Sequence, residues 1–412
     1  ATGVAVCIPL TSYLTPVAAL GMLIGIAKGS AAGSAVSAIL LNTPGEPSSA
    51  PTAFDGYPLA RQGKAQKALK MGLFASVIGD FVSTLILITL AAPLAKYALL
   101  IGPVEICAIL LFSLTFIGGL AGSSMVKGMI AAVMGIFFAT IGLETETFIP
   151  RLTFGFLELD DGISLVPMAI GMLAVAEMVA QAGRLRQLDS EAAEFIKSAR
   201  PEDQTVTRDE WKRCAPVIAR GTFIGAVIGI MPGLGASVGS FMSYSATRRA
   251  SATPEKYGTG MIEGVAAAES ADNAVVPSSL IPLFALGIPG SVIAAILIAA
   301  FILHGLTPGP LMFVQQPRLV SGLYASMICA SVILLIIGYF GQRLFSQIIH
   351  VPLRLLIPGL LLFFFVGAFM EMCSIFSIYL ILIFAVLGYL ARALAFSFVT
   401  FLIAVGIGPN RA

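Results

Sequence analysis

The stretch that decides the fold is residues 71–99, which read MGLFASVIGDFVSTLILITLAAPLAKYAL. A helix that crosses the roughly 30 Å hydrocarbon layer of a membrane needs about 20 apolar residues, because each residue advances it by about 1.5 Å. Further runs approach that length at residues 104–122, 125–143, 163–182, 324–340, 355–370 and 375–390. The pattern predicts an all-α polytopic membrane protein surrounded by a lipid bilayer.

The composition of the chain supports this prediction. Of its 412 residues, 58% are hydrophobic and 11% are charged, whereas a soluble domain carries about 25% charged residues. No basic cluster interleaved with aromatic residues indicates a nucleic-acid partner. The sequence also has no GxSxG, HExxH or Walker A motif, and its cysteines and histidines show no metal-binding spacing. We therefore expect a protein that is not an enzyme and has no cofactor.

One hydrophilic segment, residues 183–213, divides the chain into a first membrane half (1–182) and a second membrane half (214–412). This segment and the basic residues 61–70 are separated by an even number of apolar runs, so both should lie on the same side. The positive-inside rule places them in the cytoplasm. The loop 144–161 carries five acids against one arginine and is expected outside.

Glycine and proline interrupt the apolar pattern in regions 25–52, 221–239 and 263–303. Irregular backbone within a membrane is tolerated only inside the protein or beside a water-filled cavity, and paired interruptions are typical of transporter binding sites. We predict helix breaks at residues 43–46 and 287–290, with further interruptions at the PGLG (232–235) and ESADNA (269–274) sequences. The expected architecture has about 10–12 transmembrane segments with broken helices or re-entrant hairpins.

The two Pro-Gly breaks also suggest an internal repeat. Placing Pro44 and Gly45 on Pro289 and Gly290 without gaps pairs Leu41 with Leu286, and also pairs Ser34 with Ser279. We therefore expect the two membrane halves to be related by a repeat.

The breaks are the predicted substrate site. A helix that starts at membrane depth directs its free N–H groups and the positive end of its dipole into the protein, which suits a carboxylate. The alternative for the first break is an ordinary turn at the membrane surface. The predicted substrate-binding residues are Asn42, Thr43, Pro44, Gly45, Ser48, Ser49, Gly287, Ile288, Pro289 and Gly290.

Glu269, Asp272 and Asn273 are the predicted ion-coupling residues. Acids within membrane segments are energetically expensive and mark ion or proton paths. Oxygen atoms of this kind can bind a cation such as Na⁺ near Asp272 and Asn273, and a buried carboxyl can instead carry a proton. The alternative is a segment at the membrane interface with hydrated acids. Asp80 and Glu177 are weaker candidates.

Two series of glycines recur every four residues, at 25, 29 and 33 and at 221, 225, 229 and 233. This spacing places each series on one helix face and predicts close approach of another helix. Lys28 and Arg220, which lie beside the two series, are expected to snorkel or to pair locally.

The motif ILLNTPGEPSSAPTAFDGYPLARQGKAQKAL (residues 39–69) resembles the signature of the large membrane subunit of tripartite tricarboxylate transporters, the TctA family. That signature has the form LLNxPGEPSS…T…DGYPLARxGKA. The sequences GIMPGLGASVGSF, ESADNA and LGIPGS resemble other signatures of the family, and the similarity covers essentially the whole chain. The family's first half opens with a glycine-rich helix, after which Ala1 would begin, so a preceding helix is expected.

The resemblance implies a secondary transporter subunit in the bacterial inner membrane. It would import a citrate-like di- or tricarboxylate with a small membrane subunit and a periplasmic solute-binding protein, driven by a Na⁺ or H⁺ gradient. An elevator-type mechanism is also implied. The competing functions are a passive anion channel and an intramembrane enzyme.

Overall fold

The computed structural model describes residues 2–100 except 43, residue 102, and residues 125–180 except 145–148, 161 and 177. It also describes residues 203–348 except 232–233, residues 374–394, and shorter stretches between 358 and 405. The predicted run at 104–122 lies outside the described residues, as do parts of the run at 355–370 and Glu177.

The described chain is mostly helical. Its α-helices are α1 (Thr2–Thr11), α2 (Pro16–Leu41), α3 (Ala50–Leu59), α4 (Ala65–Ala98), α6 (Met125–Ala139), α7 (Leu165–Ala169), α9 (Arg208–Ile230), α10 (Gly235–Ala250), α11 (Ile262–Ser278), α12 (Leu280–Leu286), α13 (Val292–Leu303), α14 (Met312–Gln315), α15 (Pro317–Ile348) and α17 (Phe376–Ala393). Short 3₁₀ or π segments are η1 (Pro47–Ser49), η2 (Ala60–Lys64), η3 (Leu157–Leu159), η4 (Ile170–Val175) and η6 (Pro254–Lys256).

Five helices in the described residues are long and apolar enough to cross a membrane: Pro16–Leu40, Pro47–Ala98, Arg208–Ile230, Pro317–Gly341 and Phe376–Ala393. Two shorter apolar helices cover Val126–Ala139 and Val292–Leu303. The helical membrane character predicted from the composition is confirmed. The count of 10–12 segments and the relation of the two halves stay predictions.

The all-α expectation needs one correction, which is a small antiparallel hairpin. Strand β1 (Gly142–Leu143) pairs with β2 (Pro150–Arg151), with Gly142 opposite Arg151. The hairpin lies in the acidic loop, where an ion pair joins Arg151 to Glu144. Outside the apolar helices, the backbone N–H and C=O groups are not bonded within a helix, so two short strands can pair.

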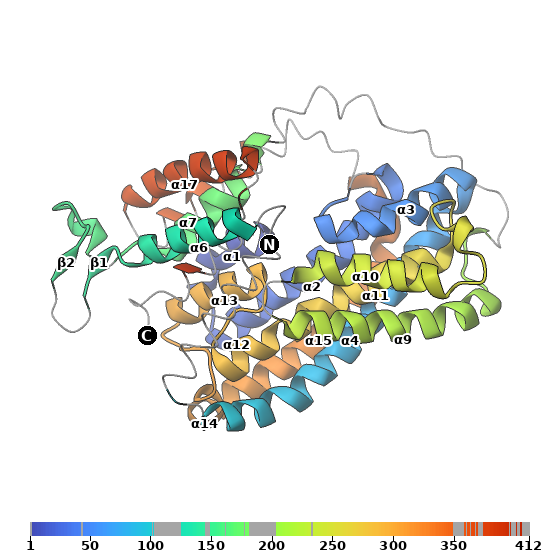
Figure 1. Cartoon of the computed structure of the whole chain (residues 1–412), viewed down its shortest axis with the longest axis horizontal. Coiled ribbons are helices and arrows are strands. Elements are labelled where there is room, and N and C mark those ends of the chain that lie inside the picture. The colour runs from blue at the N-terminus through green and yellow to red at the C-terminus, as the bar shows by residue number, and fades with distance from the viewer. Residues whose placement is uncertain are drawn as a thin grey trace.

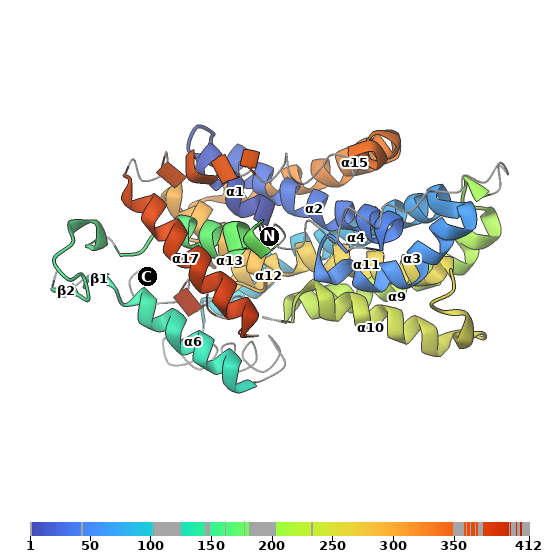
Figure 2. The ribbon, with the colours of Figure 1, turned by 90° about the horizontal axis from the view of Figure 1, so that it is seen from above.

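The centre of one end of the molecule is α11, every residue of which is buried. It packs against α3, α4, α9 and α10, which surround it in both ribbon views (Figures 1 and 2). The predicted interruption at residues 269–274 is wrong, because α11 runs continuously from Ile262 to Ser278. Its many alanines favour the helix, and partners on other helices satisfy its Glu269 side chain.

The glycine series on α9 allows this close packing. A Cβ added at Gly225 would collide with the carbonyl oxygen of Ala271, and one added at Gly221 or Gly229 would collide with serine hydroxyls of α11. The predicted helix approach is confirmed for these three residues, and Gly233 lies outside the described residues.

The glycine series on α2 behaves differently. A Cβ added at Gly25, Gly29 or Gly33 would meet no described atom within 4 Å. These residues line a cavity of about 640 Å³, and α15 contributes Ile333 and Ile337 to its walls. The prediction that another helix approaches these three glycines closely is therefore wrong among the described helices. Bulky side chains of α15 line the opposite side of the cavity.

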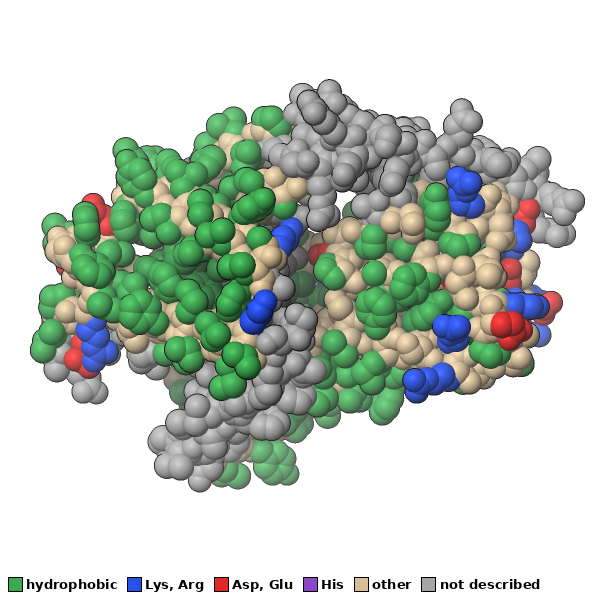
Figure 3. Space-filling view, turned by 45° about the horizontal axis from the view of Figure 1, so that its top comes forward, with side chains coloured by type: hydrophobic (Ala, Val, Ile, Leu, Met, Phe, Trp, Pro, Cys, Tyr) green, Lys and Arg blue, Asp and Glu red, His purple; other side chains and the backbone are tan. Residues whose placement is uncertain are grey.

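The two ends of the molecule differ in charge. The β1–β2 hairpin lies at one end, and the start of α9 and the end of α10 lie at the other (Figure 1). Charged side chains gather at this second end, whereas hydrophobic ones cover much of the remaining surface in Figure 3.

The basic residues 61–70 contact the end of the hydrophilic segment 183–213. Lys67 Nζ lies 2.8 Å from Glu210 Oε1, and Lys70 Nζ donates to the Gln204 carbonyl at 2.9 Å. Residues 61–70 and the described residues 203–213 therefore lie on the same side of the molecule. Helix α9 begins at Arg208, inside the predicted linker, with a capping box formed by Thr207 and Glu210.

Candidate ion and substrate site

The first predicted break is present. Helix α2 ends at Leu41, and the next residue, Asn42, adopts the left-handed conformation at φ 53°. Its N–H donates to the Ser37 carbonyl, as in a typical helix C-terminus. Pro44 cannot continue the helix, and a new helical segment starts at Pro47.

The second break has the same local pattern. Helix α12 ends at Leu286, and Gly287 is left-handed at φ 73°. Pro289 follows two residues later, as Pro44 follows Asn42. Helix α13 then begins, and the side chain of Ser291 caps it by accepting from the N–H of Ala294 at 3.2 Å. The same sequence of helix end, left-handed residue and proline therefore produces both breaks.

One face of the helix after the first break carries Ser48, Thr52 and Asp55, all buried. Their spacing of four and three residues aligns them on one side of a helix. Thr52 Oγ1 donates to Glu269 Oε1 of α11 at 2.5 Å. This face therefore attaches the first break to the buried helix of the second half.

Asp55 attaches the same helix to the loop that leads into α11. The N–H groups of Gly258, Gly260 and Met261 donate to its Oδ1 at 2.8, 3.0 and 2.8 Å. The Tyr244 hydroxyl donates to Oδ2 at 2.8 Å. With these four donors, Asp55 holds the start of α11 in place.

Glu269 is fully buried, and both of its carboxylate oxygens have donors. Besides Thr52, the Ser76 hydroxyl of α4 donates to Oε2 at 2.9 Å. Asn273 Nδ2 donates to the Glu269 carbonyl at 3.0 Å and to Oε2 at 3.4 Å. Three helices, α3, α4 and α11, therefore converge on this carboxylate.

Asp272 and Asn273 differ from Glu269. Asp272 is 0% exposed and Asn273 1%, so the alternative of acids hydrated at the interface is wrong for this helix. Asp272 Oδ1, Asp272 Oδ2, Asn273 Oδ1 and the Ser48 hydroxyl are all buried without a hydrogen-bond partner. Ser48 lies close enough to influence the Asp272 carboxyl, although no well-aligned hydrogen bond joins them. Buried polar atoms of this kind need an explanation, such as a ligand.

The other predicted residues of the first break have varied surroundings. Asn42 and Gly45 are exposed, and Thr43 lies outside the described residues. The Ser49 hydroxyl donates to the Glu46 carbonyl at 2.9 Å, and Glu46 Oε1 accepts from Ser30 of α2 at 2.7 Å. Glu46 thus turns back towards α2 and does not cap the following helix with its side chain.

The glycines at the two breaks lie against different neighbouring segments. At the first break, an added Cβ at Gly45 would meet Ser34 and Ser37 of α2. At the second break, Ile288, Pro289 and Gly290 are buried. There, an added Cβ at Gly290 would meet Ser279 and Pro282, and one at Gly287 would meet Pro308. The structure thus brings the first break together with the ion-coupling residues, and the placement of a carboxylate between both breaks stays a prediction.

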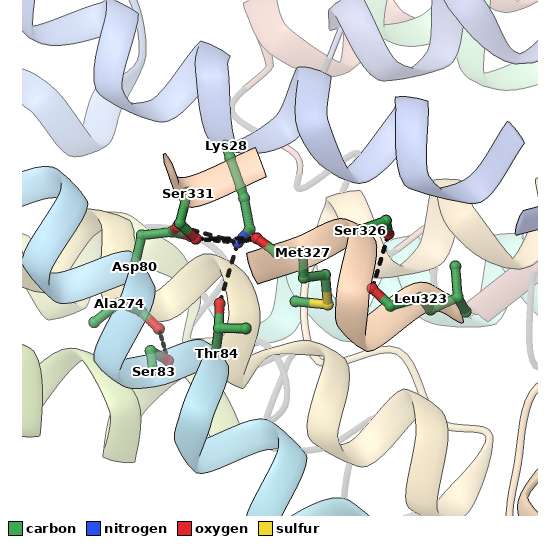
Figure 4. A network of polar contacts seen from close by, with 9 residues as sticks. All are labelled: Lys28, Asp80, Ser83, Thr84, Ala274, Leu323, Ser326, Met327 and Ser331. Carbon is green, nitrogen blue, oxygen red and sulfur yellow. Dashed lines mark hydrogen bonds and ion pairs between the residues drawn. The ribbon is translucent and has the colours of Figure 1, made fainter. Parts of the chain in front are cut away.

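Lys28 and Asp80 form a buried charge network that was not predicted from the sequence (Figure 4). Lys28 is 1% exposed, so of the two expected behaviours it pairs with neighbouring groups and does not snorkel. Its Nζ lies 3.0 Å from Asp80 Oδ2 of α4 and 2.8 Å from the Met327 carbonyl of α15. Ser331 and Thr84 complete the network, with Ser331 Oγ 2.6 Å from Asp80 Oδ2. Asp80 therefore has a structural partner that is 52 residues away in sequence.

Thr52 and Ser76 were not predicted from the sequence as partners of Glu269. The spacing of Ser48, Thr52 and Asp55 was the signal that could have identified the polar face of the helix after the first break. Ser76 has no such signal, since only the packing of α4 against α11 brings it to the carboxylate.

Sequence comparison places the chain among known proteins. The profile of the tripartite tricarboxylate transporter TctA family matches residues 1–403. A protein of Agrobacterium vitis described as "Uncharacterized 52.8 kDa protein in TAR-I ttuC' 3'region" is 36% identical over 406 residues, which are 98% of this chain and 80% of the relative. A second, "Uncharacterized protein in TAR-II ttuC' 3'region" of the same organism, is 39% identical over 165 residues, which are 40% of this chain and 68% of the relative. No solved structure matches the chain. The chain belongs to the tripartite tricarboxylate transporter TctA family.

Proposed function

We propose that this protein is the large membrane subunit of a transporter that imports a citrate-like di- or tricarboxylate across the bacterial inner membrane. Uptake is driven by a Na⁺ or H⁺ gradient. The subunit works with a small membrane subunit and receives its substrate from a periplasmic solute-binding protein. Membership of the TctA family supports a tricarboxylate transporter subunit.

The observation that carries the proposal is a buried, unpartnered carboxylate beside a helix break. Asp272 of α11 lies next to Ser48, and Ser48 belongs to the first helical turn after the Pro44–Gly45 interruption. The N-terminus of a helix favours an anion, while an intramembrane acid without a partner favours a cation or a proton. These opposite preferences at neighbouring places in the structure suit a site that binds a carboxylate and a coupling ion together.

The substrate carboxylate is proposed to bind at the first break, where Asn42 and Ser48 offer neutral hydrogen-bonding groups. The second break, with the buried residues Ile288, Pro289 and Gly290, is proposed as the other wall of the site. An elevator-type movement of the helices that carry the site would then expose it to each side in turn.

The experiment that tests this function is uptake of radiolabelled citrate by vesicles that contain all three proteins, with Na⁺ and pH gradients imposed separately. We expect uptake to require one of the gradients and the binding protein. The variant Asp272→Asn should reduce gradient-driven uptake at least about tenfold, because the charge that responds to the ion is removed.

The matched control is Glu263→Gln, which makes the same acid-to-amide change on α11. Glu263 lies at the other end of the helix, where it accepts from Arg213 Nε at 2.7 Å. This variant should transport normally. Citrate flux that persists without either gradient and without the binding protein would instead indicate a passive anion channel.

A further inference from the structure

We propose that Ser48, Asp272 and Asn273 form a Na⁺ site, in which Asp272 supplies the charge and Asn273 Oδ1 and Ser48 Oγ supply neutral oxygen ligands. This assignment rests on the proposed function, because it names the ion that drives transport and the residues that bind it.

The orientation of the Asn273 side chain is the first argument. Its Nδ2 donates to the carbonyl and to Oε2 of Glu269, at 3.0 and 3.4 Å. An amide held in this way presents its carbonyl oxygen as an acceptor. That oxygen is buried and unpartnered, beside Asp272 on the same helix. Glu269 therefore positions a ligand oxygen, and its own carboxylate oxygens are already occupied by donors.

The number of unpartnered oxygens is the second argument. Ser48 Oγ, Asn273 Oδ1 and both oxygens of Asp272 are buried without a partner, and the three residues are 3%, 1% and 0% exposed. A proton on Asp272 and the hydroxyl hydrogen of Ser48 would supply two donors to this group. A bound cation would instead use oxygens of all three residues as ligands.

The charge of the group is the third argument. One carboxylate with a neutral amide and a hydroxyl carries a formal charge of −1, which a monovalent cation balances. Divalent hard cations usually take more carboxylate ligands. In the described part of the chain, no group of three or more His, Cys, Asp or Glu side chains could hold a metal ion. The oxygen-only ligands, with a single charge among the three ligand residues, point to Na⁺.

The surrounding charges connect this site to substrate binding. Glu46 and Glu269 both place negative charge near Asp272, and Glu46 lies within the first break. An empty cation site would therefore repel a carboxylate that approaches the break, and Na⁺ would remove much of this repulsion. Because linkage is reciprocal, the carboxylate must then strengthen Na⁺ binding by the same factor.

The test is thermal unfolding of the purified membrane subunit in detergent, with NaCl replaced by KCl or choline chloride at constant ionic strength and pH. A ligand that binds only the folded protein raises the melting temperature in a saturable way. We expect such a rise with NaCl and not with KCl or choline chloride. Asp272→Asn should abolish it, and Asn273→Ala should weaken the apparent Na⁺ affinity about tenfold or more.

Two further variants keep the test decisive if a change within α11 prevents folding. Ser48→Ala, outside α11, should lower the apparent Na⁺ affinity several-fold, whereas Glu263→Gln should leave it unchanged. The Na⁺ site is overturned if stabilisation follows pH equally in NaCl and choline chloride, which would indicate a proton. It is also overturned if Na⁺ stabilises the Asp272→Asn and Ser48→Ala variants as well as the original protein.

This measurement uses no carboxylate, so its outcome is separate from that of the uptake experiment. A specific Na⁺ response without citrate uptake would reject the proposed function and keep the site. Gradient-driven uptake with no Na⁺ response would keep the function and reject the site.

Discussion

Asp272 and Glu269 are acids one helical turn apart, and their surroundings differ. Glu269 receives hydrogen bonds from Thr52, Ser76 and Asn273, while both oxygens of Asp272 have no partner. A fully hydrogen-bonded carboxylate supports the structure, whereas a buried one without donors is available to a ligand. Burial alone does not distinguish the two residues, since both are 0% exposed.

Asp55 has a structural role at the same scale. We expect Asp55→Ala to lower the stability of the protein by on the order of 3 kcal/mol, because it leaves buried N–H groups and the Tyr244 hydroxyl without an acceptor. The melting temperature in detergent would show this loss. Asp209→Asn, an exposed acid on α9, is the control and should change little; equal effects of both variants would contradict this role.

At the scale of elements, the two glycine series make a matched experiment. Gly225→Ala should destabilise the protein, because the added Cβ collides with the Ala271 carbonyl oxygen of α11. Gly29→Ala should be neutral or stabilise by up to about 1 kcal/mol, since alanine favours a helix over glycine and the α2 cavity has room. Melting temperatures of the two variants decide this, and a larger loss for Gly29→Ala would refute the packing described for α2.

The Lys28 network joins three elements, α2, α4 and α15. Lys28→Met should destabilise the protein by about 3–5 kcal/mol, because Asp80 is left as an unpaired buried charge. Changing Asp80→Leu as well should recover much of the loss, since no unpaired charge then remains. The four melting temperatures of this double-mutant cycle measure the coupling, and additive effects of the two changes would argue against a direct pair.

For the whole molecule, the acidic hairpin loop at one end and the basic residues 61–70, which contact the start of α9 at the other end, predict its orientation. The hairpin loop should face the periplasm, and the start of α9 should face the cytoplasm. In a background without native cysteines, Leu157→Cys should react with an impermeant maleimide added outside cells, since Leu157 is 81% exposed. Arg208→Cys should react only in inverted vesicles, and the reverse labelling would invert the proposed orientation.

The sequence by itself determined the membrane class, the helix breaks near residues 43–46 and 287–290, and the family. These features follow from local properties: runs of apolar side chains, prolines that cannot continue a helix, and Asn42 and Gly287, which tolerate a left-handed backbone. Only the tertiary structure decided which buried groups meet. Lys28 pairs with Asp80 over 52 residues, and Thr52 binds Glu269 over 217 residues. The same glycine spacing packs tightly on α9 and faces a cavity on α2, because the outcome depends on the opposing helix and not on the glycines themselves.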